Sequence, residues 1–419
     1  TLGTGSAGLT LPNTLTMDNV SSAIKTKNVN LTLGQALSLT AGSITSTGGT
    51  LSFSDNLTLG AGGTLDVTDS FFSVGGILDL SAGTFTTSNN SELNLNAATT
   101  LSTSSMVTFE HIYFNLNALT LGTESTHIKL CPSGSDRAYH QTTFNTGPGS
   151  LTMTCRLKMG FESQWSSTGG TITLEDGGYV PFTSTFSIPN TTLDLGELLR
   201  VLGSTSKLYL NNSTLNTNGN SVEIITNLEV EGNQDLSGVA FVASGSIFSL
   251  AGDATVNSDA ALTVGTLDLA DFALTLDNTM AGLSVAQAVT LDAAGERIVT
   301  GAADLSLNGG ISATAGTLSS TGGTLTLPIG ATLATGSSFS TSNTTLNLGG
   351  SLAVADTWTS TDTSVLLTGN VSLSSTEEIS LATLTTNGYN FELASETTDL
   401  TIENAFTLSG VETLSTRGA

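Results

Sequence analysis

Residues 166–196 read SSTGGTITLEDGGYVPFTSTFSIPNTTLDLG, and residues 319–349 read SSTGGTLTLPIGATLATGSSFSTSNTTLNLG. Without any gap, about 18 of the 31 paired positions are identical, and Ile172/Leu325 and Val180/Leu333 exchange one apolar residue for another. Self-similarity of this kind is the signature of a repeat architecture, in which each unit buries its apolar side against its neighbours. We therefore interpret the chain as a repeat protein before considering any single site.

A three-residue pattern of apolar, polar and apolar side chains recurs along the chain, as in Leu193-Asp194-Leu195. This alternation places both apolar side chains on one face of a strand. No stretch keeps a helical period, so we expect almost no helix. Successive strands begin about 20 residues apart, at Leu208, Leu228, Phe248 and Leu267, and again at Leu305, Leu325 and Leu346. The pattern predicts an all-β protein, a parallel β-helix (β-solenoid) of roughly 21 rungs with about 20 residues in each.

The composition favours ordered β-structure over disorder. Of 419 residues, 38% are hydrophobic, 11% are charged and 5% are aromatic, and the mean hydropathy is +0.19. A disordered chain has low hydrophobicity and few β-branched residues, whereas Leu, Ile and Val recur throughout this sequence. Because the chain contains only 6 Pro, little interrupts backbone pairing.

The net charge is strongly negative and excludes one class of partner. The chain has 10 basic and 35 acidic residues, a net charge of −25 and a pI of about 4.1. Such a surface repels nucleic acid, which binds clustered Lys and Arg. No apolar run is long enough to span a membrane as a helix. Neither an EF-hand loop nor the glycine-rich calcium nonapeptide is present. We therefore expect no cofactor beyond weak binding of Ca²⁺ by surface carboxylates.

Residues 106–165 break the strand pattern. The stretch contains all three His, both Cys, four of the ten basic residues and Trp165, and it includes the Pro- and Gly-containing sequence CPSGSDRAYHQTTFNTGPGS. It is expected to be an irregular, loop-rich insertion or a set of elaborated rungs between β-helix rungs in 1–105 and 166–419. Binding residues concentrate on loops carried by a rigid scaffold. His127, Arg137, His140 and Trp165 are therefore the candidates for a binding loop.

Cys131 and Cys155 are the two cysteines of the chain. In an extracellular protein an even count favours a disulfide, which here closes a loop of about 24 residues. Two free buried thiols are the first alternative. A metal site is the second; it would add His111, His127 or His140, but no CxxC or HxxxH spacing supports it.

The repeated segments also suggest side-chain ladders at the bends between strands. Asn and Thr at such bends form hydrogen bonds to the neighbouring rung, along the stacking axis. The residues that hold equivalent places in the two copies are the candidates: Asn190 and Asn343, Thr191 and Thr344, and Thr192 and Thr345.

No motif in the sequence predicts catalysis. There is no GxSxG, HExxH or Walker pattern beside the three histidines. The acidic pair Glu175-Asp176 is replaced by Pro328 and Ile329 in the second copy, so the scaffold does not require it. Glu377-Glu378 is another acidic pair. With no basic residue or aromatic platform near them in the sequence, we expect solvated turns rather than the paired carboxylates of a glycosidase.

The GGTLxL and NTTLxLG rungs, the Ser/Thr/Asn/Gly bias, the acidity and the scarcity of Cys resemble the repeats of bacterial surface proteins. Autotransporter passenger domains and filamentous-haemagglutinin-type adhesins are the nearest comparison. The resemblance covers most of the chain outside residues 106–165. It implies a right-handed parallel β-helix presented outside the cell, which acts in adhesion or as a stalk or matrix fibre.

The sequence therefore predicts a structural, extracellular rod in a cell-surface fibre, filament or adhesin, and not an enzyme. We expect the rod either to assemble end to end or to belong to a longer chain. Its expected partners are copies of itself, joined end to end or laterally, or ligands of the cell surface and polysaccharides. An unpaired strand edge at the end of a solenoid invites such association. The alternatives are a carbohydrate-active β-helix of the polysaccharide-lyase or tailspike type and a receptor-binding spike.

Overall fold

The computed structural model describes residues 8–416 apart from a set of short segments, namely residues 89, 124–125, 132–137, 140–142, 182, 202–205, 219–220, 225–226, 237–239, 357, 395–398 and 411–412. None of the described residues is helical, and the chain is a parallel β-solenoid of about 17 turns, roughly 21 residues apart. The predicted fold class is therefore confirmed. The structure has fewer turns than the sequence spacing predicted, and the turn length varies: Leu37 pairs with Leu57, but Ala118 pairs with the more distant Thr143.

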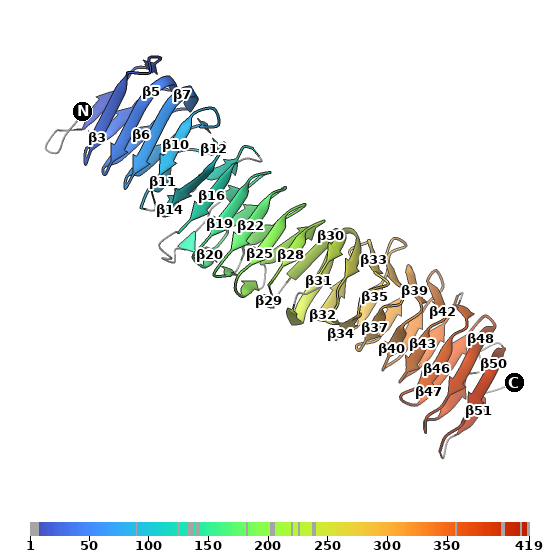
Figure 1. Cartoon of the computed structure of the whole chain (residues 1–419). Coiled ribbons are helices and arrows are strands. Elements are labelled where there is room, and N and C mark those ends of the chain that lie inside the picture. The colour runs from blue at the N-terminus through green and yellow to red at the C-terminus, as the bar shows by residue number, and fades with distance from the viewer. Residues whose placement is uncertain are drawn as a thin grey trace. The chain divides into compact units, whose positions relative to one another are not determined.

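The chain divides into two compact units, unit 1 with Thr1–Tyr209 and Ser213–Val222, and unit 2 with Leu210–Asn212 and Glu223–Ala419. Strands of both units are labelled in Figure 1. In each unit, strands pair in parallel with the corresponding strand of the next turn. Strands β27 (Lys207–Asn211) and β29 (Ser221–Ile224) contain residues of both units.

Unit 1 begins with a six-stranded parallel sheet, β1 (Leu9–Leu11), β4 (Leu31–Leu33), β6 (Thr50–Phe53), β8 (Phe71–Val74), β11 (Glu92–Leu95) and β14 (His111–Tyr113). A second series runs β2 (Leu15–Met17), β5 (Leu37–Thr47), β7 (Leu57–Thr68), β9 (Leu78–Asp79), β12 (Thr99–Ser102), β15 (Ala118–Leu121), β18 (Thr143–Asn145), β21 (Gln164–Ser166) and β24 (Thr185–Ser187). The long strands β5 and β7 also pair with a third series, β3 (Ala23–Lys27) and β10 (Thr84–Thr87). Later turns have the series β13 (Met106–Phe109), β16 (His127–Leu130), β19 (Ser150–Met153), β22 (Thr171–Leu174), β25 (Thr192–Leu195) and β28 (Thr214–Asn216), and the series β17 (Ala138–Tyr139), β20 (Leu157–Met159), β23 (Gly178–Val180) and β26 (Leu199–Val201).

Unit 2 has the same construction. Its first long strands are β30 (Asn227–Asp235), β31 (Ala240–Asn257) and β32 (Leu262–Asp268). One series continues as β33 (Ala273–Leu276), β36 (Arg297–Thr300), β39 (Thr317–Thr321), β42 (Ser338–Ser342) and β45 (Trp358–Thr361). The next is β34 (Gly282–Val285), β37 (Asp304–Leu307), β40 (Thr324–Leu327), β43 (Thr345–Leu348), β46 (Ser364–Leu367), β48 (Ile379–Thr385) and β50 (Leu400–Thr407). A seven-stranded sheet contains β35 (Val289–Leu291), β38 (Ile311–Ala313), β41 (Ala331–Leu333), β44 (Leu352–Val354), β47 (Val371–Ser375), β49 (Phe391–Leu393) and β51 (Leu414–Thr416).

The core of each unit consists of columns of apolar side chains. In unit 1, Leu31, Leu51 and Phe72 occupy the same register on successive turns and are fully buried. The rings of Phe53 and Phe72 meet edge to face, 5.7 Å apart. Burial of one such side chain contributes about 1.5–3 kcal/mol. Each inward position of a strand thus contributes one apolar side chain per turn, and the side chains at that position stack into a column.

Buried Ser and Thr hydroxyls lie at a bend of the solenoid, near the end of one strand and just before the start of the next. In the first repeat copy, Thr191 Oγ1 donates to Ser167 Oγ at 2.8 Å, and both residues are buried. In the second, Thr344 Oγ1 donates to Ser320 Oγ at 3.2 Å, and Ser320 Oγ in turn accepts from Thr300 Oγ1 at 2.9 Å. These bonds run from turn to turn and satisfy polar groups that would otherwise be costly to bury.

The four threonines among the predicted ladder candidates have two different roles. Thr191 and Thr344 form the axial hydroxyl bonds. Thr192 lies beside them but on the outer face, in register with Thr171 and Thr214, and Thr345 is exposed, in register with Thr324 and Ser364.

Asn190 and Asn343 lie at bends, as the sequence predicted, but the side-chain bond of Asn343 stays within its own turn. Both adopt the left-handed backbone conformation, with φ of 51° and 50°, which Asn tolerates better than most residues. Asn343 Nδ2 donates to Ser342 Oγ of its own turn at 3.3 Å. Axial bonds of Asn occur elsewhere in unit 2: Asn370 Oδ1 accepts from the backbone N–H of Asn390 at 3.0 Å, and Asn390 Oδ1 from that of Thr413 at 2.9 Å.

The two repeat copies have the same strands. Strands β22, β23, β24 and β25 correspond to β40, β41, β42 and β43, and every strand start is displaced by the same offset that relates the two copies in the sequence. Each copy is therefore one complete turn followed by the first strand of the next turn, because β22 pairs with β25 and β40 with β43. A single-residue gap between the copies would turn the inward side chains of a strand outward.

Residues 106–165 were expected to be an irregular insertion or elaborated rungs. Their described part forms the strands β13 to β21, which pair in parallel with other turns. The elaboration is a lengthening of the turn between β15 and β18, where Ala118 pairs with Thr143. The described part of the stretch therefore belongs to the solenoid.

Candidate functional site

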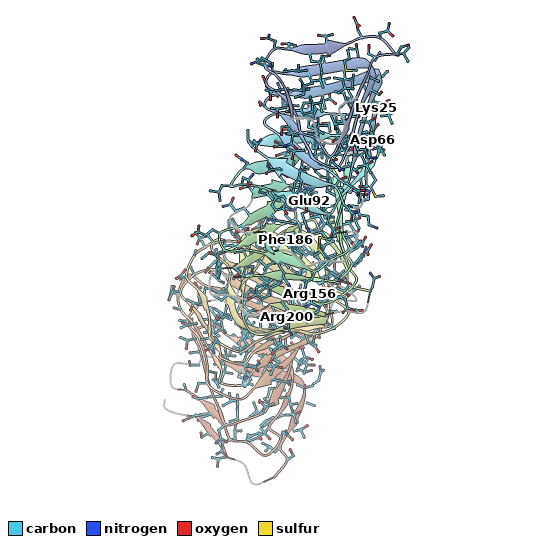
Figure 2. All side chains as sticks on the ribbon, turned by 90° about the vertical axis from the view of Figure 1, so that its left-hand side faces the viewer. Lys25, Asp66, Glu92, Arg156, Phe186 and Arg200 are labelled. Atoms are coloured by element: carbon cyan, nitrogen blue, oxygen red, sulfur yellow. A yellow bond between two sulfur atoms is a disulfide. The ribbon has the colours of Figure 1, made fainter. Side chains whose placement is uncertain are left out.

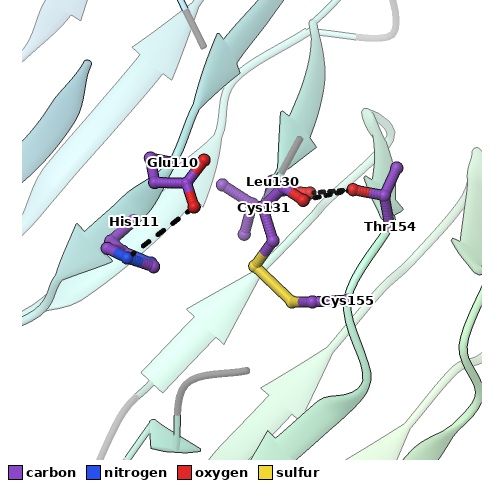
Figure 3. Close-up of a disulfide and its surroundings, with 6 residues drawn as sticks. All are labelled: Glu110, His111, Leu130, Cys131, Thr154 and Cys155. Carbon is purple, nitrogen blue, oxygen red and sulfur yellow. Dashed lines mark hydrogen bonds and ion pairs between the residues drawn. A yellow bond between two sulfur atoms is a disulfide. The ribbon is translucent and has the colours of Figure 1, made fainter. Parts of the chain in front are cut away.

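The two cysteines join adjacent turns of unit 1 (Figure 3). Cys131 follows β16 and Cys155 follows β19, and their Sγ atoms form a disulfide with the Cα atoms 5.5 Å apart. Both residues are fully buried, and the Thr154 hydroxyl beside them donates to the carbonyl oxygens of Leu130 and Cys131. The bond cross-links one solenoid turn to the next, and neither a free thiol nor a metal is involved.

The two described candidates for a binding loop, His127 and Trp165, point to opposite faces of the solenoid wall. Arg137 and His140 lie outside the described residues. Trp165 is a core residue, 2% exposed, and its ring meets that of Phe144 edge to face at 5.0 Å. Its assignment to a binding loop was wrong, because it occupies the inward position of β21.

His127 is the candidate that reaches the outer surface. Its side chain lies on the outer face of β16, where Nε2 is 2.9 Å from Thr152 Oγ1 of the next turn. Partial burial lowers the pKa of His127 below its ordinary value, and the positive charge of Lys129 on the same strand lowers it further. A neutral imidazole bonded to a hydroxyl is a surface contact between turns.

The acidic pairs lie at exposed bends. Glu175 and Asp176 connect β22 to β23, and Glu377 and Glu378 connect β47 to β48. The first pair is exposed, as expected for a solvated turn, but Arg156 Nε donates to the backbone carbonyl oxygen of Asp176 at 3.3 Å. A basic residue therefore lies beside this bend, contributed by the preceding turn.

That arginine belongs to a groove on the face formed by β20, β23 and β26. The groove has a volume of about 640 Å³. Its lining combines basic and aromatic residues with apolar residues, glycines and one carboxylate: Arg156, Lys158, Met159, Gly160, Phe161, Gly178, Tyr179, Pro181, Glu197, Leu198 and Arg200. All of these residues belong to unit 1.

The middle of this groove is a column of three side chains, one from each turn. Lys158 is the register partner of Tyr179, and Tyr179 is the register partner of Arg200. Lys158 and Tyr179 are half-buried and Arg200 is exposed, whereas their neighbours Leu157, Val180 and Leu199 point into the core and are fully buried. Because adjacent strands are about 4.8 Å apart, the two cationic residues are separated by roughly 10 Å along the stacking direction.

The ends of the strands complete the groove. Arg156 precedes β20 and is exposed, and Figure 2 shows it on the same side of the ribbon as Arg200. Phe161 follows β20 and is 55% exposed, which is unusual for a Phe in a chain that buries most of its large apolar residues. The groove thus has cationic groups on its floor and rim and exposed aromatic surface beside them. We call Arg156, Lys158, Phe161, Tyr179 and Arg200 the basic–aromatic groove.

The corresponding column in unit 2 has none of this chemistry. Through the repeat, Tyr179 corresponds to Thr332, which pairs in register with Ser312 and Ala353. The scaffold of this face is therefore built equally well from Ser, Thr and Ala. Lys, Tyr and Arg in the unit 1 column are not a requirement of the fold.

Sequence reasoning missed this groove. Arg156, Tyr179 and Arg200 appear in the sequence as isolated residues. The signal was present: Lys158, Tyr179 and Arg200 follow one another at two equal intervals, each the length of one turn. Applying the turn length to polar positions as well as apolar ones would have found the column.

A second hollow, of about 590 Å³ in unit 2, has the opposite charge and is lined in part by Asp268, Asp271, Asp292 and Glu296. Glu296 is 6% exposed, and its carboxylate accepts from the backbone N–H groups of Asp292 and Ala293 at 2.6 and 3.1 Å. Its charge therefore stabilises the bend of its own turn. In the part of the chain that the structure describes, no three His, Cys, Asp or Glu side chains are grouped to hold a metal ion, and no helix is long and apolar enough to cross a membrane.

Comparison with protein-family models, with curated protein sequences and with solved structures finds no match. The chain is thus identified by its fold alone: it is a parallel β-solenoid repeat protein.

Proposed function

We propose that the chain is a structural β-solenoid of the cell surface, a segment of a fibre, filament or adhesin, that works without catalytic chemistry or a resident cofactor. The observation that carries this proposal is the turn-to-turn pairing of backbone, apolar side chains and buried hydroxyls in both units. Each turn is held by two neighbours, so resistance to unfolding and to proteases increases with the number of turns.

The disulfide supports the extracellular part of the proposal. Disulfides persist in oxidising compartments and are rare where thiol reductants are abundant. The bond between Cys131 and Cys155 is fully buried and joins two turns. An acidic β-solenoid whose turns are cross-linked by a disulfide suits a protein exposed to proteases outside the cell.

Self-association is the partner interaction we propose for this scaffold. In the last described turn of unit 2, Phe406 is 40% exposed and Leu414 is 51% exposed. Leu384, one turn before Phe406 in register, is fully buried. A turn stacked on this edge, from a second copy or from further chain, would bury the same positions and pair the open strands.

Antibody labelling of intact cells of the source organism tests the location, with permeabilised cells as the control. We expect labelling without permeabilisation, and labelling that requires it would refute the proposal. Sedimentation velocity of the purified chain tests self-association. We expect concentration-dependent oligomers, and a monomer at every concentration would refute end-to-end assembly.

A further inference from the structure

We propose that the basic–aromatic groove binds an acidic polysaccharide, one in which carboxylate-bearing sugars are interspersed with neutral ones. The proposal concerns a site that the structural role of the solenoid does not need, and it does not depend on where the protein is located. It rests on the charge of the groove, its direction, its aromatic surface and its absence from the equivalent face of unit 2.

The charge of the groove is opposite to that of the chain. Three of the ten basic residues, Arg156, Lys158 and Arg200, line one groove of a protein with a net charge of −25. The one carboxylate in the lining is Glu197. Arg and Lys donate charge-assisted hydrogen bonds, and the arginine fork matches a carboxylate. The groove therefore suits an anionic ligand.

The arrangement of the cations favours a linear ligand over a compact ion. Lys158, Tyr179 and Arg200 form a column across three turns, so the cations lie roughly 10 Å apart. A compact anion would contact both only if the long side chains of Lys158 and Arg200 leaned toward each other over Tyr179. A polymer laid along the stacking direction can place an acidic group at each cation and an uncharged unit at Tyr179 between them.

The aromatic side chains favour sugar as the uncharged part. Binding sites combine apolar and aromatic surface with a few placed polar groups. Phe161 is 55% exposed and Tyr179 half-buried in the same groove. The C–H face of a pyranose ring packs on such a surface, and its hydroxyls bond to Tyr and Arg. Dense polyanions such as nucleic acid are disfavoured, because every added negative charge is repelled by the surrounding acidic surface.

The repeat shows that this chemistry is an addition to the scaffold. The equivalent column in unit 2 is Ser312, Thr332 and Ala353. The fold should therefore accept Ser, Thr or Ala in the unit 1 column, and Tyr179→Thr is one such substitution.

Lys25 and Lys27 are both exposed on β3 of unit 1. Replacing them is a matched control, because it removes two positive charges outside the groove.

Calorimetric titration with a hyaluronan hexasaccharide, in which glucuronate alternates with N-acetylglucosamine, tests the proposal. The carboxyl-reduced hexasaccharide is the neutral control, and an oligoglutamate of equal charge is the peptide control. We expect the native chain to bind the acidic sugar, more weakly as salt rises, and to bind each control at least about tenfold more weakly.

The variants separate charge from stacking. Lys158→Gln/Arg200→Gln should weaken binding by about tenfold or more, and Tyr179→Thr by several-fold with an unchanged salt dependence. Lys25→Gln/Lys27→Gln should bind as the native chain does, and all variants should unfold at the native temperature. Absence of binding to the native chain, equal binding of oligoglutamate, or an equal loss in the Lys25/Lys27 control would overturn the proposal. So would dissociation of native oligomers by Lys158→Gln/Arg200→Gln, since the groove would then hold a second copy.

Discussion

Thr191 Oγ1 lies 2.8 Å from Ser167 Oγ of the preceding turn, and the same bond recurs in the second repeat copy between Thr344 and Ser320. Both pairs are buried. The Thr191 hydroxyl also lies 2.9 Å from the Pro189 carbonyl oxygen, a second acceptor for the same proton. The buried Thr191 hydroxyl therefore links its bend to the preceding turn.

Replacing Thr191 with Val keeps its shape and removes its hydroxyl. We expect the free energy of unfolding to fall by about 1–2 kcal/mol, because the partners of the hydroxyl stay buried without it. Thr192→Val on the outer face is the control and should change stability by less than about 0.5 kcal/mol. Denaturant unfolding measures both, and equal effects of the two substitutions would contradict the ladder.

The disulfide should stabilise unit 1 through its loop, whose two ends are 24 residues apart. Cys131→Ala/Cys155→Ala is expected to lower the free energy of unfolding by about 3 kcal/mol, because the unfolded chain regains the freedom of that loop. Guanidinium unfolding with and without reductant measures the loss. Reductant should destabilise the native chain and leave the double variant unchanged. If reductant left the free energy of unfolding of the native chain unchanged, even after the chain had been fully unfolded and refolded in its presence, the cross-link would be contradicted.

Trp165 should behave as a core residue. Trp165→Ala removes an aromatic side chain that is 2% exposed and packs on Phe144, so a loss of about 3–5 kcal/mol is expected. Tyr179→Thr on the outer face should cost less than about 1 kcal/mol. Thermal unfolding compares the two. If Trp165→Ala were as stable as the native chain, the inward position of β21 would be wrong.

Gly330 should resist substitution by Ala. Its φ is +90°, and an added Cβ would overlap the Ser351 carbonyl oxygen of the next turn. We expect Gly330→Ala to cost more than about 2 kcal/mol, since it adds backbone strain to a clash between main chains. Gly245, where an added Cβ meets no atom within 4 Å, is the control, and its Ala variant should be close to native in thermal unfolding.

The pKa of His127 is lowered from 6.5 by burial and by Lys129. The unfolded chain therefore takes up the proton more readily than the folded one. The contribution of His127 to stability is present above pH 6.5 and is lost as the pH falls below that value toward the folded pKa. His127→Asn should flatten the pH dependence of stability in this window. An NMR titration of the imidazole with a pKa at or above its ordinary value would contradict the assignment.

The sequence by itself determined the solenoid. Alternation in Leu193-Asp194-Leu195 sets an inward and an outward face, and recurrence at about one turn length stacks the inward residues. It also named Cys131 and Cys155 as a candidate disulfide pair, with free thiols and a metal site as alternatives, and Thr191 and Thr344 as ladder candidates. These features depend on local chemistry and on a period, both of which can be read along the chain.

Only the tertiary structure decided which side chains share a column. The number of residues in each bend sets the register, and one residue more or less reverses a side chain between core and surface. That is why Trp165 could be taken for a loop residue, and why the column of Lys158, Tyr179 and Arg200 went unseen. Each of these three is unremarkable in its own turn. Register brings them together because the two intervening turns have equal length.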